Sequence, residues 1–206
     1  MKDKFQKLKN AVETKPKYLV NQKVIFPIYS FDLSGEFDVN AFTEKLLPLK
    51  ESKDKNHKPE VVVDGYQTKT FQSTGMVDCV QEINTIIENK SKLVFDQNYK
   101  IKDSWLVFYD EGTEVLPHHH YSLKSFYEGS KQFLIYPISF AYYPLCTKKS
   151  SPIIFSNLDG NDLVIPIEQN TLLIFNSHLM HFVPKSTDDK LRIVYSGNLF
   201  VNGFKG

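Results

Sequence analysis

Pro117-His118-His119-His120 lies in the middle of the chain and follows the short run Glu114-Val115-Leu116. In an extended strand, residues two apart project from the same face, about 7 Å apart along the chain. His118 and His120 therefore aim two imidazoles at one point. His119 projects from the other face, where a packed or hydrogen-bonded neighbour is expected rather than a ligand. The stretch indicates a strand that carries part of a metal site.

A third donor is available far downstream, in the segment Phe175-Asn176-Ser177-His178-Leu179-Met180-His181. His181 would complete a facial set of three ligands and leave the opposite side of the metal open for chemistry. His178 is three residues earlier, which is the opposite face of a strand, so it ranks below His181. A surface cluster of histidines remains the alternative at this point.

The chain from about residue 103 onward has the period-two pattern of β-strands. Turn-forming clusters such as 110–112, 157–162 and 186–189 separate the apolar segments. Many short strands at regular spacing predict a double-sheet jelly roll, in which strands distant in sequence become neighbours. The predicted strands are 105–109, 131–136, 139–143, 153–156, 163–167, 172–175, 182–183 and 192–200.

The first half of the chain is read as an α/β jacket over residues 1–102, packed on a jelly-roll catalytic core at 103–206 within a single domain. The fold class is mainly β, a cupin-like double-stranded β-helix with N-terminal helices packed on it. The expected elements of the jacket are helices at 4–13, 39–47 (ending near Pro48) and 77–90, and a strand at 24–31.

Composition narrows the classes of partner. The 206 residues include 25 Lys and Arg and 24 Asp and Glu. The net charge of +1 lacks the excess of positive charge that is typical of proteins that bind nucleic acid or an anionic membrane. Cys79 and Cys146 are not spaced as a metal knuckle or a redox pair, which favours a reducing compartment. No N-terminal apolar region or membrane span is present in the sequence, so a soluble cytoplasmic protein is expected.

Arg192 opens the last predicted strand, whose other residues are mostly apolar or small. A guanidinium in that setting is either exposed at an edge or buried against an anion, and its fork is the natural bidentate partner of a carboxylate. Arg192 is therefore a candidate for holding the far end of a metal-bound acid.

These residues together resemble a known group of enzymes. The set consists of 105–109, Gly112, His118-x-His120, Ser139-x-x-Tyr142-Tyr143, Phe175-x-Ser177-x-Leu179-x-His181-x-Val183, Arg192 and Asn198. It is similar to the 2-oxoglutarate- and Fe(II)-dependent oxygenases related to prolyl hydroxylases, and more narrowly to their uncharacterised bacterial and phage branch. That branch has a Gly-Gly-Trp-Gln-like turn before the core. The corresponding segment of this chain would be Asp64-Gly65-Tyr66-Gln67. The resemblance covers roughly residues 20 to 202.

The resemblance implies a metal site and a cosubstrate. Fe(II) would be held by His118, His120 and His181, and 2-oxoglutarate would chelate it while its distal carboxylate meets Arg192. With dioxygen, the enzyme would hydroxylate an unactivated C–H bond of an unidentified substrate, either a peptide side chain or a small metabolite. No nucleic acid or membrane partner is implied, and pairing into a homodimer through sheet edges stays open.

The sequence departs from the pattern of these enzymes in three places. His120 stands where most of them have Asp or Glu, which makes a bound iron one charge more positive. Val194 replaces a hydroxyl residue, so Tyr109, Tyr142 and Ser196 are the candidates to assist Arg192 with the cosubstrate. The connection at 121–138 is longer than usual, and we expect either a lid or a surface excursion there.

Two alternative functions remain open on the sequence alone. The first is a cupin-like protein that uses three histidines to bind a metal for a reaction without 2-oxoglutarate; it would be favoured by an exposed Arg192. The second is a non-catalytic jelly-roll binding protein that has kept the fold.

Overall fold

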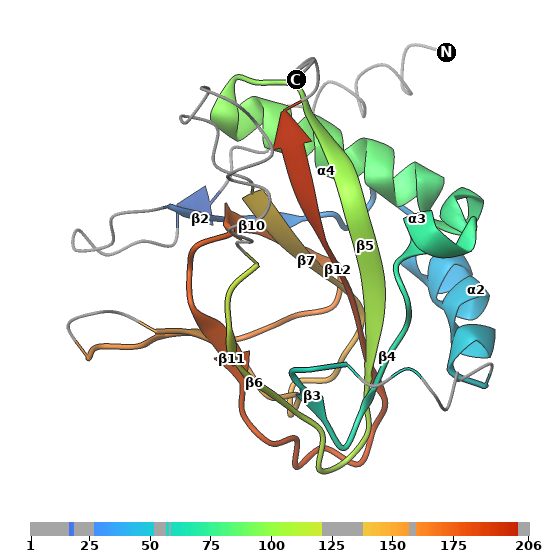
Figure 1. The fold of residues 1–206 in the computed structure, drawn as a ribbon, viewed down its shortest axis with the longest axis vertical. Helices are drawn as coiled ribbons and strands as arrows, with labels where there is room; N and C mark the ends of the chain where they lie inside the picture. The colour runs from blue at the N-terminus through green and yellow to red at the C-terminus, as the bar shows by residue number, and fades with distance from the viewer. Residues whose placement is uncertain are drawn as a thin grey trace.

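The computed structural model describes residues 17–18, 27–51, 57, 59–120, 138–156 and 160–201. Within these residues two antiparallel sheets face each other (Figure 1). The large sheet has the order β1 (Lys17–Tyr18), β2 (Ile28–Asp32), β10 (Thr171–Asn176), β7 (Ile138–Leu145), β12 (Arg192–Val201), β5 (Tyr99–Tyr109) and β4 (Tyr66–Gln67). The small sheet has the order β3 (Val62–Val63), β6 (Glu114–His118), β11 (His181–Val183), β8 (Ile153–Phe155) and β9 (Leu163–Ile165).

The mainly β, two-sheet architecture predicted from the sequence is confirmed. The predicted strands that lie within the described residues all have counterparts, with small differences at their ends. The largest difference is at β5, which begins at Tyr99 because it pairs with β12 as far as Val201. The predicted helix at 4–13 and strand at 131–136 lie outside the described residues, as does nearly all of the 121–138 connection.

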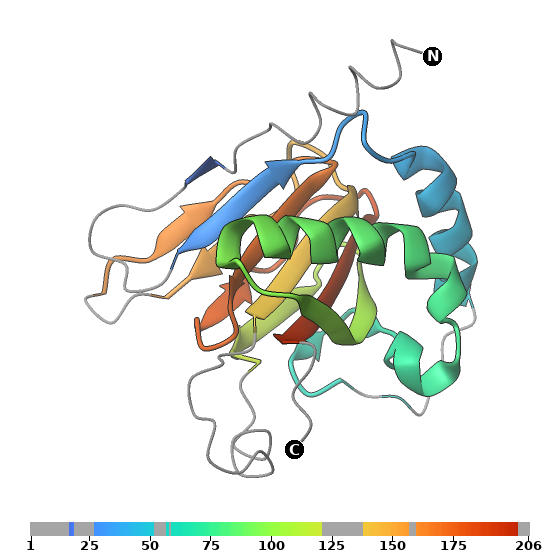
Figure 2. The ribbon, with the colours of Figure 1, turned by 90° about the horizontal axis from the view of Figure 1, so that it is seen from above.

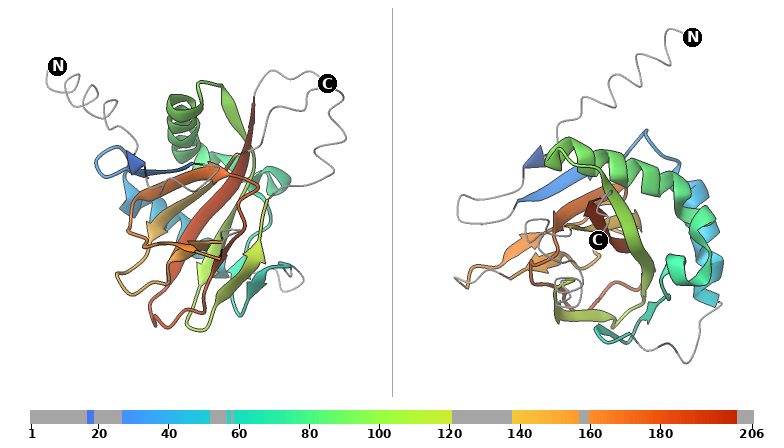
Figure 3. Two further views of the ribbon diagram at one scale, coloured as in Figure 1. Left: turned by 90° about the vertical axis from the view of Figure 1, so that its left-hand side faces the viewer. Right: turned by 45° about the horizontal axis from the view of Figure 1, so that its top comes forward.

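Helices cover one face of the large sheet. They are α2 (Val39–Glu51), α3 (Phe71–Thr74), the 3₁₀ helix η1 (Val77–Val80) and α4 (Gln81–Phe95). Figure 2 shows α4 lying across the strands of this sheet, and Figure 3 shows the helices on the side away from the small sheet. One core cluster joins the two layers through Phe42, Leu46, Ile83, Ile87, Leu106, Phe108, Ile193 and Tyr195. Among the described residues, no helix is long and apolar enough to cross a membrane.

Two helix boundaries differ from the prediction. α2 continues through Pro48 to Glu51. Proline removes one backbone donor and so disfavours a helix interior. The packing of Leu49 against the core, one residue later, favours the continuation of the helix. The predicted helix at 77–90 begins instead as η1, and Val80 (φ −116°, ψ 5°) separates this turn from α4. α4 then runs to Phe95, beyond the predicted end, and Asp96 in the left-handed conformation terminates it.

The opposite face of the large sheet turns toward the small sheet, and a second core cluster lies between them. Alternation along β12 separates the two environments. Ile193, Tyr195 and Leu199 belong to the core beneath the helices. Arg192, Val194, Ser196 and Asn198 line a cavity between the sheets. Arg192, Ser196 and Asn198 are thereby placed on the face of β12 that turns to this cavity.

Gly197 allows β12 to lie close to its neighbours. A Cβ atom at this position would lie 2.4 Å from the backbone oxygen of Asp103 and 2.7 Å from the ring of Phe140. Neither group is free to move, because Asp103 is in the paired strand β5 and Phe140 is fully buried. Glycine is therefore required beside Asn198.

We predict that Gly197→Ala lowers the stability of the fold by about 3 kcal/mol through overpacking. For a chain of this length the melting temperature should fall by about 6 to 12 °C. Ser196→Ala, one residue earlier on β12, is the matched control and should change stability by less than about 0.5 kcal/mol. Thermal denaturation followed by circular dichroism measures both, and equal melting temperatures for the two variants would contradict the packing argument.

Candidate metal centre

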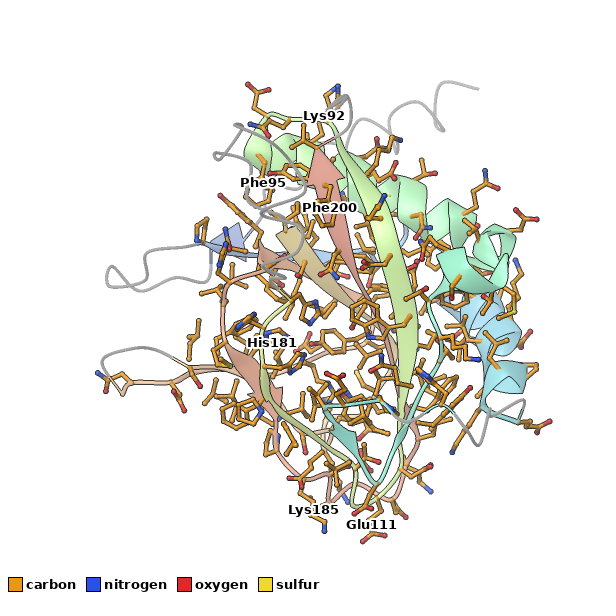
Figure 4. The ribbon with its side chains drawn as sticks, in the orientation of Figure 1. Lys92, Phe95, Glu111, His181, Lys185 and Phe200 are labelled. Atoms are coloured by element: carbon orange, nitrogen blue, oxygen red, sulfur yellow. The ribbon has the colours of Figure 1, made fainter. Side chains whose placement is uncertain are left out.

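Strand pairing brings the three predicted histidines together. His118 ends β6 and His181 begins β11, and the two residues are direct partners in the antiparallel ladder. His120 follows two residues after His118, and its backbone N–H donates to the carbonyl of Ser177, 3.0 Å away. Figure 4 shows His181 in the interior, beside β11. The imidazoles of His118 and His120 thus lie next to that of His181, between the two sheets.

The spacing of the imidazole nitrogens suits one metal ion. One ligand atom from each of His118, His120 and His181 lies within 4.8 Å of the others. The Nε2 atoms of His118 and His120 are 3.2 Å apart. Two nitrogens that bind one metal at about 2.0–2.1 Å and at a right angle lie about 3 Å apart. The arrangement therefore has the dimensions of a facial ligand set.

Backbone carbonyls orient two of the three rings. The Nδ1 of His118 lies 2.8 Å from the oxygen of Leu116, and the Nδ1 of His181 lies 2.9 Å from the oxygen of Leu179. A carbonyl can only accept, so Nδ1 must carry the proton in both rings. The Nε2 of each ring then has a free lone pair directed at the common centre.

The third ring is oriented by a side chain. The Nδ1 of His120 lies 2.8 Å from the amide oxygen of Asn198. With Nδ1 as donor, the Nε2 atoms of His118 and His120 face each other at 3.2 Å with no proton between them. Two facing lone pairs repel, and a cation held by both removes that repulsion. The donor set therefore fits a transition-metal ion.

Burial keeps the three imidazoles neutral. It lowers the pKa of His120 to about 4, and it lowers the pKa of His118 and of His181 as well. Neighbouring imidazoles add to the effect in each case, since two adjacent cations repel. Neutral imidazole is the form that binds metals, so the site is ready for an ion at neutral pH. His119 is exposed and is not part of the set.

The triad opens into a cavity of about 240 Å³ between the sheets. Most of its wall is aliphatic or aromatic, and a few polar groups converge on it, which is typical of ligand pockets. None of the described residues in its lining is acidic. The lining includes Gln67, Trp105, Val107, Tyr109, Tyr143, Ile153, Phe175, Val183, Arg192, Val194, Ser196 and Asn198 with the three histidines.

Arg192 is a buried cation in this cavity. Its side chain is only 3% exposed, and its Nη1 donates to the backbone oxygen of Ser151 at 2.7 Å. The guanidinium lies over the rings of Tyr109 and Tyr143, 4.3 and 5.3 Å from their centroids. Its Nε has no hydrogen-bond partner, and no carboxylate among the described residues forms an ion pair with it. A buried charge in this state calls for an anion.

Known proteins resemble this chain in fold. No protein-family model and no curated protein sequence matches the chain. Solved structures do match. HygX from Streptomyces hygroscopicus, with nickel and 2-oxoglutarate bound, is 10% identical over 86% of this chain and 84% of its own, with a TM-score of 0.60. A prolyl hydroxylase from Trichoplax adhaerens, in complex with a hypoxia inducible factor peptide, is 12% identical over 98% and 94%, with a TM-score of 0.60.

A third match comes from nogalamycin biosynthesis. The epimerase SnoN, in complex with Fe³⁺, α-ketoglutarate and nogalamycin RO, is 9% identical over 84% of this chain and 78% of its own, with a TM-score of 0.64. The chain has the fold of 2-oxoglutarate-dependent oxygenases. The resemblance seen in the sequence is thus confirmed at the level of the fold.

Of the three residues predicted to assist Arg192, two line the cavity and one does not. Tyr109 and Ser196 line the cavity. Tyr142 does not: it packs in the core beneath the helices, and its hydroxyl donates to the Oδ1 of Asn170 at 2.8 Å. Tyr143 takes its place next to Arg192. β7 is buried on both faces, so its sequence has no polar and apolar alternation to reveal which of the two tyrosines faces inward.

Sequence reasoning assigned no role to the groups behind His120. Asn198 belonged to the resemblance, but its contact with the ring was not foreseen, nor was its link to Ser139 and Asp103. Cross-strand pairing places Asp103 and Ser139 directly opposite Asn198. The sequence does have one polar residue at the corresponding position of each of these three strands. This pattern can be recognised only when the order of the strands in the sheet is known.

We predict that His181→Ala abolishes stoichiometric binding of Co²⁺ while leaving a folded protein, because one of three ligands is lost. His119→Ala is the matched control, since that exposed imidazole lies between the two other ligands in sequence but outside the set. Isothermal titration calorimetry of the metal-free proteins measures binding, and circular dichroism reports folding. Stoichiometric binding by His181→Ala with unchanged affinity would remove His181 from the site.

Proposed function

We propose that this protein is an Fe(II)- and 2-oxoglutarate-dependent oxygenase that hydroxylates an unactivated C–H bond. The observation that carries the proposal is the buried guanidinium of Arg192, which has no carboxylate partner among the described residues and lines the same cavity as three converging imidazoles. A metal-binding end and an anion-binding end in one apolar cavity suit a small dicarboxylate that also chelates a metal.

Each group of the cavity has a role in this proposal. His118, His120 and His181 would hold Fe(II), and Arg192 would bind the distal carboxylate of 2-oxoglutarate. Tyr109 and Ser196, which line the same cavity, would assist it. Tyr142 is replaced by Tyr143 in this role, because Tyr143 is the one that contacts the guanidinium.

The reaction that follows is balanced without a further reductant. One 2-oxoglutarate, one O₂ and one C–H bond give succinate, CO₂ and an alcohol, with one oxygen atom in succinate and the other in the alcohol. Iron, when bound, supplies the oxygen chemistry that side chains lack. The protein binds and orients the reactants, and the apolar wall of Val107, Ile153, Val183 and Val194 excludes water.

A neighbouring loop fixes the anion-binding end. Ser151, whose carbonyl accepts from Arg192, follows a turn in which Ser150 donates to Asp188 at 3.2 Å. Thr147 also donates to Asp188. The guanidinium is therefore held by the carbonyl of Ser151, by the faces of two tyrosines and by a side-chain hydrogen bond with Tyr143. Its Nε, which has no partner, stays available to a carboxylate.

The solved neighbours support the choice of metal and cosubstrate. HygX was crystallised with nickel and 2-oxoglutarate, and SnoN with Fe³⁺ and α-ketoglutarate. Their further ligands include a peptide and antibiotics. For this chain we propose a peptide side chain or a small metabolite as substrate. A nucleic acid is disfavoured by the near-neutral charge of the chain.

The buried Arg192 also bears on the cupin-like alternative, which would be favoured by an exposed arginine. That alternative would retain the three-histidine metal site but would have no use for an enclosed cation. The oxygenase accounts for both features with one ligand. A non-catalytic jelly roll that binds neither a metal nor an anion accounts for neither feature, because a buried charge without an anion costs stability.

The direct test of the proposed activity is the formation of succinate from 2-oxoglutarate. The Fe(II)-loaded protein in aerated buffer should convert 2-oxoglutarate to succinate even without its own substrate, though slowly, and His181→Ala should not. Succinate is quantified by mass spectrometry. Bound iron without any succinate above the His181→Ala background would speak against the oxygenase.

We predict that Arg192→Lys weakens 2-oxoglutarate binding about 30-fold, because one charge-assisted hydrogen bond worth about 2 kcal/mol is lost. A lysine offers a point charge in place of a planar fork. Metal affinity should not change. Lys190→Gln, which removes an exposed positive charge two residues earlier, is the control and should leave both affinities unchanged.

The measurement is calorimetric titration of the Ni²⁺-loaded variants, since nickel avoids oxidation during the experiment. Equal 2-oxoglutarate affinity in Arg192→Lys and wild type would take Arg192 out of the cosubstrate site.

A further inference from the structure

Three groups surround the side-chain amide of Asn198. Its Oδ1 lies 2.8 Å from the Nδ1 of His120 and 2.8 Å from the Oγ of Ser139. Its Nδ2 donates to the Oδ1 of Asp103 at 2.7 Å. Asp103 and Ser139 are the residues opposite Asn198 on the two strands that pair with β12, so the contacts follow from the strand register.

The three groups differ in what they can fix. A hydroxyl can donate or accept, and a neutral imidazole nitrogen is a donor or an acceptor according to its tautomer. Ser139 has a further flexible partner in the hydroxyl of Ser177, 2.7 Å away, so it can follow either orientation of the amide. Burial raises the pKa of Asp103, while hydrogen bonds from the side chain and backbone of Asn198 favour its ionised form. An ionised carboxylate can only accept. Among these groups, only Asp103 determines which end of the amide faces His120.

The orientation of the amide decides the tautomer of His120. With Nδ2 turned to Asp103, Oδ1 faces the ring, and Nδ1 of His120 must carry the proton. With the amide reversed, Nδ2 would face Nδ1, and the ring proton would move to Nε2. That proton would point into the space shared with the Nε2 of His118, where a metal would bind.

We propose that Asp103 is a positioning residue, which fixes His120 in its metal-binding tautomer through the amide of Asn198. The inference rests on the proposed metal-binding role of His120. It also explains why a carboxylate stands behind this histidine in particular. His118 and His181 donate to backbone carbonyls, which cannot reverse, whereas His120 depends on an amide that can.

The tautomer is observable without any metal. In metal-free protein labelled with ¹⁵N-histidine, long-range ¹H–¹⁵N spectra distinguish a protonated Nδ1 from a protonated Nε2. Wild-type His120 should have its proton on Nδ1. In Asp103→Asn, residue 103 can accept or donate, so the Asn198 amide is free to reverse, and a measurable share of His120 should move its proton to Nε2. Asp96→Asn, at the exposed end of α4, is the control and should match wild type.

Metal affinity gives a second, independent readout. Loss of an outer partner of a ligating histidine typically weakens metal binding 10- to 100-fold, so Co²⁺ affinity in Asp103→Asn should fall by about 10-fold. The double variant Asp103→Asn, Asn198→Asp should restore both readouts. Its carboxylate at 198 can only accept from His120, and the amide at 103 can donate to it.

An unchanged His120 tautomer in Asp103→Asn overturns the inference, even if that variant is less stable, because a purely structural role predicts lost stability alone. Failure of the double variant to restore the Nδ1 proton also overturns it. The spectra are recorded without metal, so they remain informative if wild type binds no Co²⁺. In that event the metal function fails, and the tautomer result still decides the role of Asp103.

Discussion

The antiparallel pairing of β6 with β11 is the interaction on which the proposed site depends. It places His118 directly opposite His181, and the chain then needs only two more residues to bring His120 to the same point. β12 contributes the rest from the facing sheet: Arg192 at one end and Asn198, behind His120, toward the other. A shift of one residue in either ladder would turn these side chains to the opposite face.

The polar groups of the cavity are costly to bury, and each is compensated in a different way. The imidazoles remain neutral, with Nδ1 satisfied by a carbonyl or an amide. The guanidinium of Arg192 has a carbonyl, two aromatic faces, a side-chain hydrogen bond with Tyr143 and an unpaired Nε. A cation among the imidazole nitrogens and an anion near the guanidinium would complete this compensation. A metal ion chelated by a dicarboxylate would supply both.

Much of this could be predicted from the sequence because it depends on local periodicity. Alternation gave the strands, and the His-x-His spacing gave two inward imidazoles. What could not be predicted depends on tertiary packing: the choice of Tyr143 over Tyr142 in a strand buried on both faces, and the alignment of Asp103, Asn198 and Ser139 across three strands. The continuation of α2 past Pro48 likewise reflects the packing of Leu49, which local propensity does not contain.

The central claim is that one cavity binds a metal and a 2-oxo acid together. The most direct measurement is an anaerobic titration of the Fe(II)-loaded protein with 2-oxoglutarate, followed by visible absorption. A 2-oxo acid chelated to Fe(II) produces a metal-to-ligand charge-transfer band, and the account predicts a saturable band that His181→Ala does not give. Bound iron that yields no band at saturating 2-oxoglutarate would contradict the claim and favour a three-histidine metal protein without this cosubstrate.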